Sequence, residues 1–367
     1  MTREEIQQEA LKATENRQRV GLGLATGVGK TLVGLKYLER ESVSKLPRVL
    51  IVAPKKSVMD TWKAEADKFN LKHVLCNVKF TTYLSLHKHD PNIYDIVILD
   101  EMHSLLFSHQ EFLANFRGKI LGLTGTPPKH PKSEKGEMVN DYCPIAYEYV
   151  TDDAVDNNIL NDYKIIVHEL SMSGKNDFLV KAGKKEFYSS EVKNYAYWTT
   201  RLENSGRQKE LQINRVMRMK AMMEYPSKEK YAKLLSNSIK SKCLIFANTQ
   251  EQADRLCHYS YHSKNPDSEE NLELFKNGTI NQLSCVLQLS EGVNIPDLKQ
   301  SIILHAYGNE RKASQRIGRC LRLSPDQTAI IHILCYKNTV DETWVKAALE
   351  GFNEEKITWK NFNVNLD

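Results

Sequence analysis

The 367-residue sequence lacks the features that would place it in a membrane or in an oxidising compartment. No apolar run approaches the ~20 residues of a membrane-spanning helix, and the N-terminal stretch MTREEIQQEALKATENRQR is too polar for a secretory signal. The seven cysteines form no C-x-x-C pair, so they indicate reduced thiols and neither a disulfide framework nor a zinc site. We therefore expect a cytoplasmic protein with no membrane partner.

The sequence also lacks a large excess of charge of one sign, but its charge is uneven. It has 51 Lys and Arg against 46 Asp and Glu, a formal net charge of +5. Residues 164–240 hold 16 basic and 8 acidic residues, so this segment alone carries +8. Such a segment indicates either a polyanionic partner or a solvated helical surface, and charge alone leaves both open.

Short apolar strands alternate with helical patterns in two successive series, which predicts parallel α/β sheets covered by helices. Their near-continuous Val, Ile and Leu indicate burial on both faces. We expect one domain over 1–155 and a second over 156–367, with a helical insertion at about 176–240. The predicted strands are 19–25, 48–54, 94–100 and 119–125, followed by 163–170, 242–248, 284–289, 300–306 and 328–334.

A glycine-rich turn follows the first predicted strand, in ATGVGKT (25–31). Gly27 and Gly29 allow a turn whose backbone N–H groups point at phosphate, and the following helix adds its positive N-terminal end. Lys30 supplies an ammonium for the β- and γ-phosphates, and Thr31 a hydroxyl ligand for Mg²⁺. The strict phosphate-loop pattern has a glycine where Leu24 stands. The predicted nucleotide-binding residues are Thr26, Gly27, Val28, Gly29, Lys30 and Thr31.

An acidic pair ends another buried strand, in VILDEMH (97–103). An α/β sheet places its ligand chemistry at the carboxyl ends of its strands. We expect Asp100 to hold Mg²⁺ through water, and Glu101 to orient and deprotonate an attacking water. An acidic helix N-cap is the alternative for Asp100. Activation of water predicts that the nucleotide is hydrolysed.

Basic residues recur at helical spacing in QRIGRCLRLS (315–324). Gln315, Arg319 and Arg322 are four and three residues apart, so they share one helix face. An arginine placed against the γ-phosphate stabilises the charge of the transition state, which is worth roughly 10³–10⁵ in rate. If these arginines come from the other domain, ATP binding closes a cleft and hydrolysis lets it open. An ordinary basic helix face is the alternative.

These stretches resemble, in order and over nearly the whole chain, the motifs of the superfamily 2 helicases. ATGVGKT resembles motif I, IVAPKKSVMDTW (51–62) motif Ia, KFTTYLSL (79–86) motif Ib, DEMH (100–103) the DExH form of motif II, and LTGTP (123–127) motif III. CLIFANTQEQADRL (243–256) resembles motif IV, SEGVNIPDL (290–298) motif V and QRIGRCLR (315–322) motif VI. The resemblance implies two RecA-like parallel-sheet domains in tandem, with ATP in the cleft between them.

The resemblance also implies a role for single residues, with ATP and Mg²⁺ as cofactors. His103 and Gln315 would couple the two domains across the nucleotide, and Thr124 and Thr126 would link hydrolysis to motion. Gln7 would read the adenine, although Gln8 is adjacent and the usual flanking Pro-Tyr is absent. The implied catalytic set is Lys30, Asp100, Glu101, Gln315, Arg319 and Arg322. The residues that match nucleic-acid contacts are Pro54, Lys55, Thr82, Tyr83, Asn248, Thr249, His262 and Gly292.

The motifs EGVNIP and QRIGRCLR are more similar to those of phage recombination helicases and restriction-enzyme motor subunits than to those of DEAD-box RNA helicases. The resemblance thus implies a monomeric 3′→5′ DNA helicase or translocase that acts on single-stranded, forked or branched DNA. Its setting would be replication, recombination or repair in a bacterial or phage-infected cell. The alternative is an RNA helicase or an ATP-gated RNA-binding protein. A metabolic kinase is disfavoured, because it has no use for a second sheet that delivers arginines.

Lysines and aromatic residues interleave within the basic segment, in KAGKKEFYSSEVKNYAYWTTR (181–201). Basic groups for phosphates beside rings for bases suit single-stranded nucleic acid. The same aromatic residues also suit a core that packs the helices together, and this second interpretation is the stronger one. The sequence leaves both interpretations open.

Overall fold

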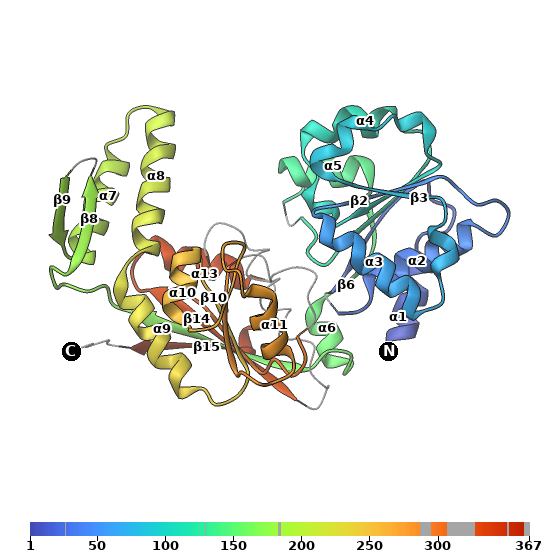
Figure 1. Cartoon of the computed structure of the whole chain (residues 1–367). Coiled ribbons are helices and arrows are strands. Elements are labelled where there is room, and N and C mark those ends of the chain that lie inside the picture. Colours follow the sequence, from blue (N-terminus) through green and yellow to red (C-terminus); the bar gives the residue numbers. More distant parts are fainter. Residues whose placement is uncertain are drawn as a thin grey trace. The chain divides into compact units, whose positions relative to one another are not determined.

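The computed structural model describes residues 1–25, 27–128, 130–182, 185–286, 295–306, 327–350 and 352–362. Within these residues the chain forms two compact units (Figure 1). Unit 1 comprises Met1–Asp162, and unit 2 begins at Tyr163. No helix among the described residues combines the length and the apolar character needed to cross a membrane.

Unit 1 is built on a six-stranded sheet with the order β3-β2-β4-β5-β1-β6, in which all neighbouring strands are parallel. β2 and β4 are buried along their whole length, as their apolar sequences predict. The strands are β1 (Arg19–Leu24), β2 (Val49–Ala53), β3 (Val78–Thr82), β4 (Ile96–Asp100), β5 (Lys119–Thr124) and β6 (Ile145–Tyr149). The helices are α1 (Arg3–Lys12), α2 (Lys30–Glu41), α3 (Lys56–Lys68), α4 (Gln110–Asn115), α5 (Glu134–Tyr142) and α6 (Thr151–Asp156).

Unit 2 is built on a seven-stranded sheet with the order β11-β12-β10-β13-β14-β7-β15. Its strands are β7 (Asp162–Leu170), β10 (Cys243–Phe246), β11 (Ser260–Tyr261), β12 (Gln282–Cys285), β13 (Gln300–Ile303), β14 (Thr328–Tyr336) and β15 (Ile357–Phe362). Its helices include α9 (Pro226–Ser238), α10 (Gln250–Leu256), α11 (Ser268–Lys276) and α13 (Val340–Leu349). Together with unit 1, this arrangement confirms the predicted tandem of RecA-like α/β domains.

The segment expected to be a helical insertion (176–240) contains three helices but begins with a strand pair that the sequence did not predict. β8 (Phe178–Ala182) and β9 (Lys185–Ser189) form an antiparallel hairpin. α7 (Glu191–Glu203) and α8 (Gln208–Met223) follow and pack against each other (Figure 1). The sequence shows no clear strand pattern for this hairpin, because its strands are short, mix charged with apolar residues and are largely exposed.

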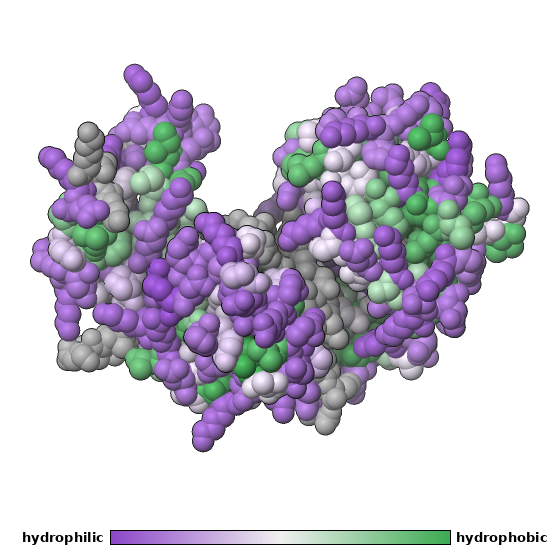
Figure 2. All heavy atoms as spheres, viewed as in Figure 1, coloured by the Kyte–Doolittle hydropathy of each residue, from purple (hydrophilic) through white to green (hydrophobic). Residues whose placement is uncertain are grey.

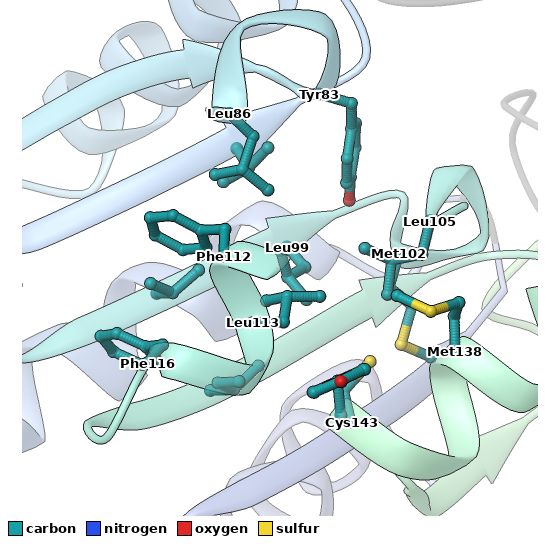
Figure 3. Close-up of a cluster of buried hydrophobic side chains, with 14 of the residues drawn as sticks. Tyr83, Leu86, Leu99, Met102, Leu105, Phe112, Leu113, Phe116, Met138 and Cys143 are labelled. Carbon is teal, nitrogen blue, oxygen red and sulfur yellow. The ribbon is translucent and has the colours of Figure 1, made fainter. Parts of the chain in front are cut away.

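The core of unit 1 includes a cluster of buried side chains to which α4 and α5 both contribute (Figure 3). Met102, which follows β4, lies in this cluster and is fully buried. A Cβ added to Gly122 of β5 would overlap the Met102 sulfur. The absence of a side chain at Gly122 therefore leaves room for Met102 to pack against the sheet. The packing of Met102 therefore fixes the turn that carries the acidic pair.

Candidate nucleotide site

Three neighbouring strands of unit 1 bring predicted site residues together at the carboxyl ends of the strands. The strand order β4-β5-β1 and the parallel register place Asp100 beside Leu123, and Thr124 beside Gly23. Asp100 is the last residue of β4, and Thr124 is the last residue of β5. The turn before α2 follows β1 at the same edge, where parallel sheets bind ligands.

The glycine turn has the backbone conformation that its sequence predicts. Gly27 and Gly29 both have φ of 101°, a value that residues with side chains rarely adopt. Gly29 is the N-cap of α2, and no side chain caps the first N–H groups of this helix. Lys30 and Thr31 open the helix and are half-buried. The described part of the turn is therefore suited to hold an anion at the helix N-terminus.

Lys30 and Glu101 form an ion pair in which the ammonium donates to Glu101 Oε1 over 2.7 Å. Burial acts to raise the pKa of Glu101, but the charges of Lys30 and His103 outweigh it and lower the pKa. Burial and then the charge of Glu101 raise the pKa of Asp100. The two adjacent carboxyl groups are thus electrostatically distinct.

The backbone separates the two carboxylates. Glu101 has φ of 53°, in the left-handed region, which costs a residue with a side chain roughly 1–2 kcal/mol. This turn directs Glu101 toward Lys30, whereas Asp100 Oδ2 accepts a hydrogen bond from Trp62 Nε1 at 2.7 Å. Each carboxylate therefore has its own partner.

His103, Thr124 and Thr126 form one hydrogen-bonded group with Glu101. His103 Nδ1 lies 2.7 Å from Thr124 Oγ1 and 3.3 Å from Glu101 Oε2. The Thr126 N–H donates to Thr124 Oγ1 over 3.1 Å. The structure thus brings together three of the residues for which a coupling role is predicted, and connects them to Glu101.

Gln7 contacts the glycine turn, whereas its neighbour Gln8 is exposed. Gln7 Nε2 donates to the carbonyl of Val28 over 2.9 Å, and the Lys36 ammonium lies 3.5 Å from Gln7 Oε1. A Cβ on Gly29 would lie 2.7 Å from Gln7 Nε2. Of the two glutamines, Gln7 alone lies beside the predicted nucleotide turn.

The residues predicted to contact nucleic acid differ in their exposure. Lys55, at the N-cap of α3, and Thr249, at the N-cap of α10, are exposed, and Pro54, Thr82 and Asn248 are half-buried. Tyr83 is buried and donates to the Asp100 carbonyl over 2.9 Å. His262 is buried, with Nε2 2.7 Å from Asp254 Oδ1. The structure gives the side chains of Tyr83 and His262 partners inside the protein.

Five predicted site residues lie outside the described residues, namely Thr26, Gly292, Gln315, Arg319 and Arg322. Conversely, the structure reveals Trp62 as a direct partner of Asp100, a contact that the sequence does not predict. Its only sequence signal is its place at the end of the stretch that resembles motif Ia.

Two family models match the chain. Residues 1–129 match the res subunit of type III restriction enzymes, and residues 227–324 match the helicase conserved C-terminal domain. Both matches, together with the order of the motifs, support a superfamily 2 helicase that resembles the motor parts of restriction enzymes. The predicted resemblance to restriction-enzyme motors is thereby confirmed, and the protein is an ATPase of the helicase class.

Known proteins resemble this helicase at low sequence identity. The DNA 3′-5′ translocase XPB2 of Sulfurisphaera tokodaii is 26% identical over 369 residues, which cover 92% of this chain and 82% of the relative. The DNA-bound Type ISP restriction-modification enzyme LlaBIII matches with a TM-score of 0.63 at 14% identity, over 100% of this chain and 32% of that one. The chain thus spans about a third of the LlaBIII enzyme.

RNA-bound Dbp5 of S. cerevisiae also shares the fold, with a TM-score of 0.59 at 12% identity over 97% of this chain and 89% of that one. Because structures bound to DNA and to RNA both match, the fold alone leaves the choice of nucleic acid open.

Proposed function

We propose that this helicase is an ATP-dependent DNA translocase or helicase for replication, recombination or repair. The observation that carries the proposal is the Lys30–Glu101 ion pair at the glycine turn, with Asp100 adjacent. In this pair, the ammonium that would bind phosphate contacts the carboxylate that would activate water. DNA is favoured as the track because XPB2, which aligns over 92% of this chain, is named a DNA 3′-5′ translocase.

The residues at the turn fit ATP with Mg²⁺. Hard oxygen ligands suit this ion, and Asp100 offers a carboxylate and Thr31 a hydroxyl at the N-terminal end of α2. When bound, Mg²⁺ would neutralise charge on the β- and γ-phosphates. Gln7 would contact the adenine while it holds the Val28 carbonyl.

The ion pair suggests an order of events on nucleotide binding. Lys30 leaves Glu101 for the β- and γ-phosphates, because a polyphosphate offers the ammonium more negative charge than one carboxylate does. Glu101 Oε1 is then free to accept a hydrogen bond from the attacking water and to take its proton. Binding of ATP itself would therefore release the base.

The group formed by His103, Thr124 and Thr126 would transmit the event away from the phosphate. His103 lies between Glu101 and Thr124, so loss of charge at Glu101 alters a hydrogen bond at the end of β5. Gln315, Arg319 and Arg322 would act on the γ-phosphate from the second domain, so that the cleft closes with ATP and opens after hydrolysis.

An ATPase assay with a panel of nucleic acids tests the proposed function. Single-stranded, duplex, forked and junction DNA are compared with RNA of matched sequence at low salt. We expect one or more of the DNA substrates to stimulate the ATPase rate at least tenfold more than RNA does. Stimulation by RNA alone would support the RNA helicase alternative. An ATPase rate that no nucleic acid changes would contradict both.

A further inference from the structure

The indole of Trp62 is fully buried and contacts the acidic pair through Asp100. Its N–H donates to Asp100 Oδ2 over 2.7 Å, and Asp100 is itself only 6% exposed. A buried indole N–H requires an acceptor, and a buried carboxylate requires donors. The hydrogen bond meets both needs and ties Oδ2 of Asp100 to the indole.

The packing of α2 fixes the plane of this indole. Gly34 lies one turn into α2, and a Cβ at this position would overlap the Trp62 ring edge. The same Cβ would lie 3.2 Å from Leu123 of β5. Because α2 begins with Lys30 and Thr31, the indole connects Asp100 to the helix that would hold the phosphates.

Tyr83 holds the same residue by a different atom. Its hydroxyl donates to the backbone carbonyl of Asp100 over 2.9 Å, and Figure 3 shows this hydroxyl directed toward the turn that contains Met102. Tyr83 therefore restrains the end of β4, whereas Trp62 restrains the carboxylate itself. Loss of the Trp62 donor can therefore be compared with loss of the Tyr83 donor.

We propose that Trp62 is a positioning residue, whose N–H holds Asp100 Oδ2 and so presents Oδ1 to the Mg²⁺ that accompanies ATP. The proposal rests on the proposed function, because it concerns the same nucleotide site. Trp62 contributes orientation and does not touch the nucleotide. Its loss then lowers the gain in nucleotide affinity that Mg²⁺ provides, and leaves metal-free binding unchanged.

The test compares Trp62→Phe with Tyr83→Phe, since each removes one buried donor to Asp100 and keeps an aromatic ring. Affinity for a fluorescent ATP analogue is measured in EDTA and in Mg²⁺. For Trp62→Phe we expect a similar affinity in EDTA and about a tenfold loss of the Mg²⁺-dependent gain, the size of one charge-assisted hydrogen bond. The Mg²⁺ concentration for half-maximal ATPase activity should rise. Tyr83→Phe should keep most of the gain.

An equal loss of affinity in EDTA and in Mg²⁺ would show that Trp62 only fills space, and an unchanged Mg²⁺ gain would also overturn the proposal. If the wild type itself shows no Mg²⁺-dependent gain, the proposed function fails instead. Trp359→Phe in unit 2 is the matched tryptophan control.

A measurement on the wild-type protein covers the case in which Trp62→Phe does not fold. The indole ¹⁵N–H signal of Trp62 is assigned by eliminating those of Trp198, Trp344 and Trp359. We expect it to shift when Mg²⁺ is added to protein that already holds ADP, because the acceptor carboxylate gains a cation. A signal that does not move would overturn the proposal.

Discussion

At the scale of single residues, the Lys30–Glu101 pair allows two substitutions that break one contact with different consequences. Lys30→Ala removes the phosphate cation, so nucleotide affinity should fall at least tenfold. Glu101→Gln keeps size and polarity but loses the base, so nucleotide affinity should be retained while turnover falls by roughly 10²–10⁴. Equilibrium binding and steady-state ATPase assays measure the two effects. Equal losses of affinity in both variants would contradict the separate roles.

The sequence predicted which residues line the glycine turn, but not how they pair. Trp62 and Asp100 are 38 residues apart, and Tyr83 and Asp100 are 17 apart. No local pattern reports such contacts, since they arise only when α3 and the turn after β3 pack on the end of β4. For Tyr83 the motif suggested a surface contact, whereas its ring is buried.

At the scale of elements, the strand predictions separate central strands from edge strands. The nine predicted strands correspond to the four central strands of unit 1 and the five central strands of unit 2. The missed strands of these two sheets are β3, β6, β11 and β15, and each stands at a sheet edge. A central strand is buried on both faces and shows a continuous apolar run, whereas an edge strand is partly exposed and mixes polar residues.

Two neighbouring strands of unit 2 carry a buried histidine pair that should make stability depend on pH. His168 of β7 and His332 of β14 are 2.9 Å apart, measured from Nε2 to Nδ1. Burial, then His332 and Lys360, lower the pKa of His168 to about 3. Burial and Lys360 lower that of His332 to about 4.

Both histidines are neutral in the folded protein near pH 5, whereas the unfolded chain binds protons below about pH 6.5. Between about pH 4 and 6.5 the unfolded state therefore holds more protons, and the free energy of unfolding falls as pH falls, by up to ~2.7 kcal/mol per pH unit for two groups. Urea unfolding between pH 7.5 and 5 measures this slope. His332→Gln should reduce it, whereas His73→Gln, at an exposed position, should leave it unchanged.

At the scale of the whole molecule, the excess of positive charge and the exposed aromatic residues coincide in one part of unit 2. Tyr188 is 67% exposed and Tyr197 is 52% exposed, although Tyr195 packs on the core. Lys193, Tyr197 and Arg201 lie four residues apart on α7, and all three are exposed. Figure 2 shows hydrophobic side chains among hydrophilic ones in this region. The aromatic residues thus serve both the core and the surface.

This surface should contribute to binding of single-stranded DNA, and charge and aromatic contacts should be separable by salt. Binding is measured by fluorescence anisotropy at several salt concentrations. The double variant Lys193→Gln/Arg201→Gln should reduce the slope of log K against log salt by about 1.4, which corresponds to two phosphates on a single strand. Tyr188→Ser/Tyr197→Ser should weaken binding about tenfold or more at every salt concentration and leave the slope unchanged.

The control for this experiment is Lys12→Gln/Lys45→Gln, which removes two exposed charges from unit 1 and thus changes the net charge by the same amount. If binding responded only to net charge, this control would weaken it as much as the α7 variant does. If α7 itself contacts the DNA strand, the control should weaken binding less than the α7 variant does. The reason is that exposed charges more than about 10 Å from the strand are screened at 0.1 M salt. If the two charge variants had equal salt slopes, α7 would not be part of the binding surface. Its basic residues would then only keep that surface solvated.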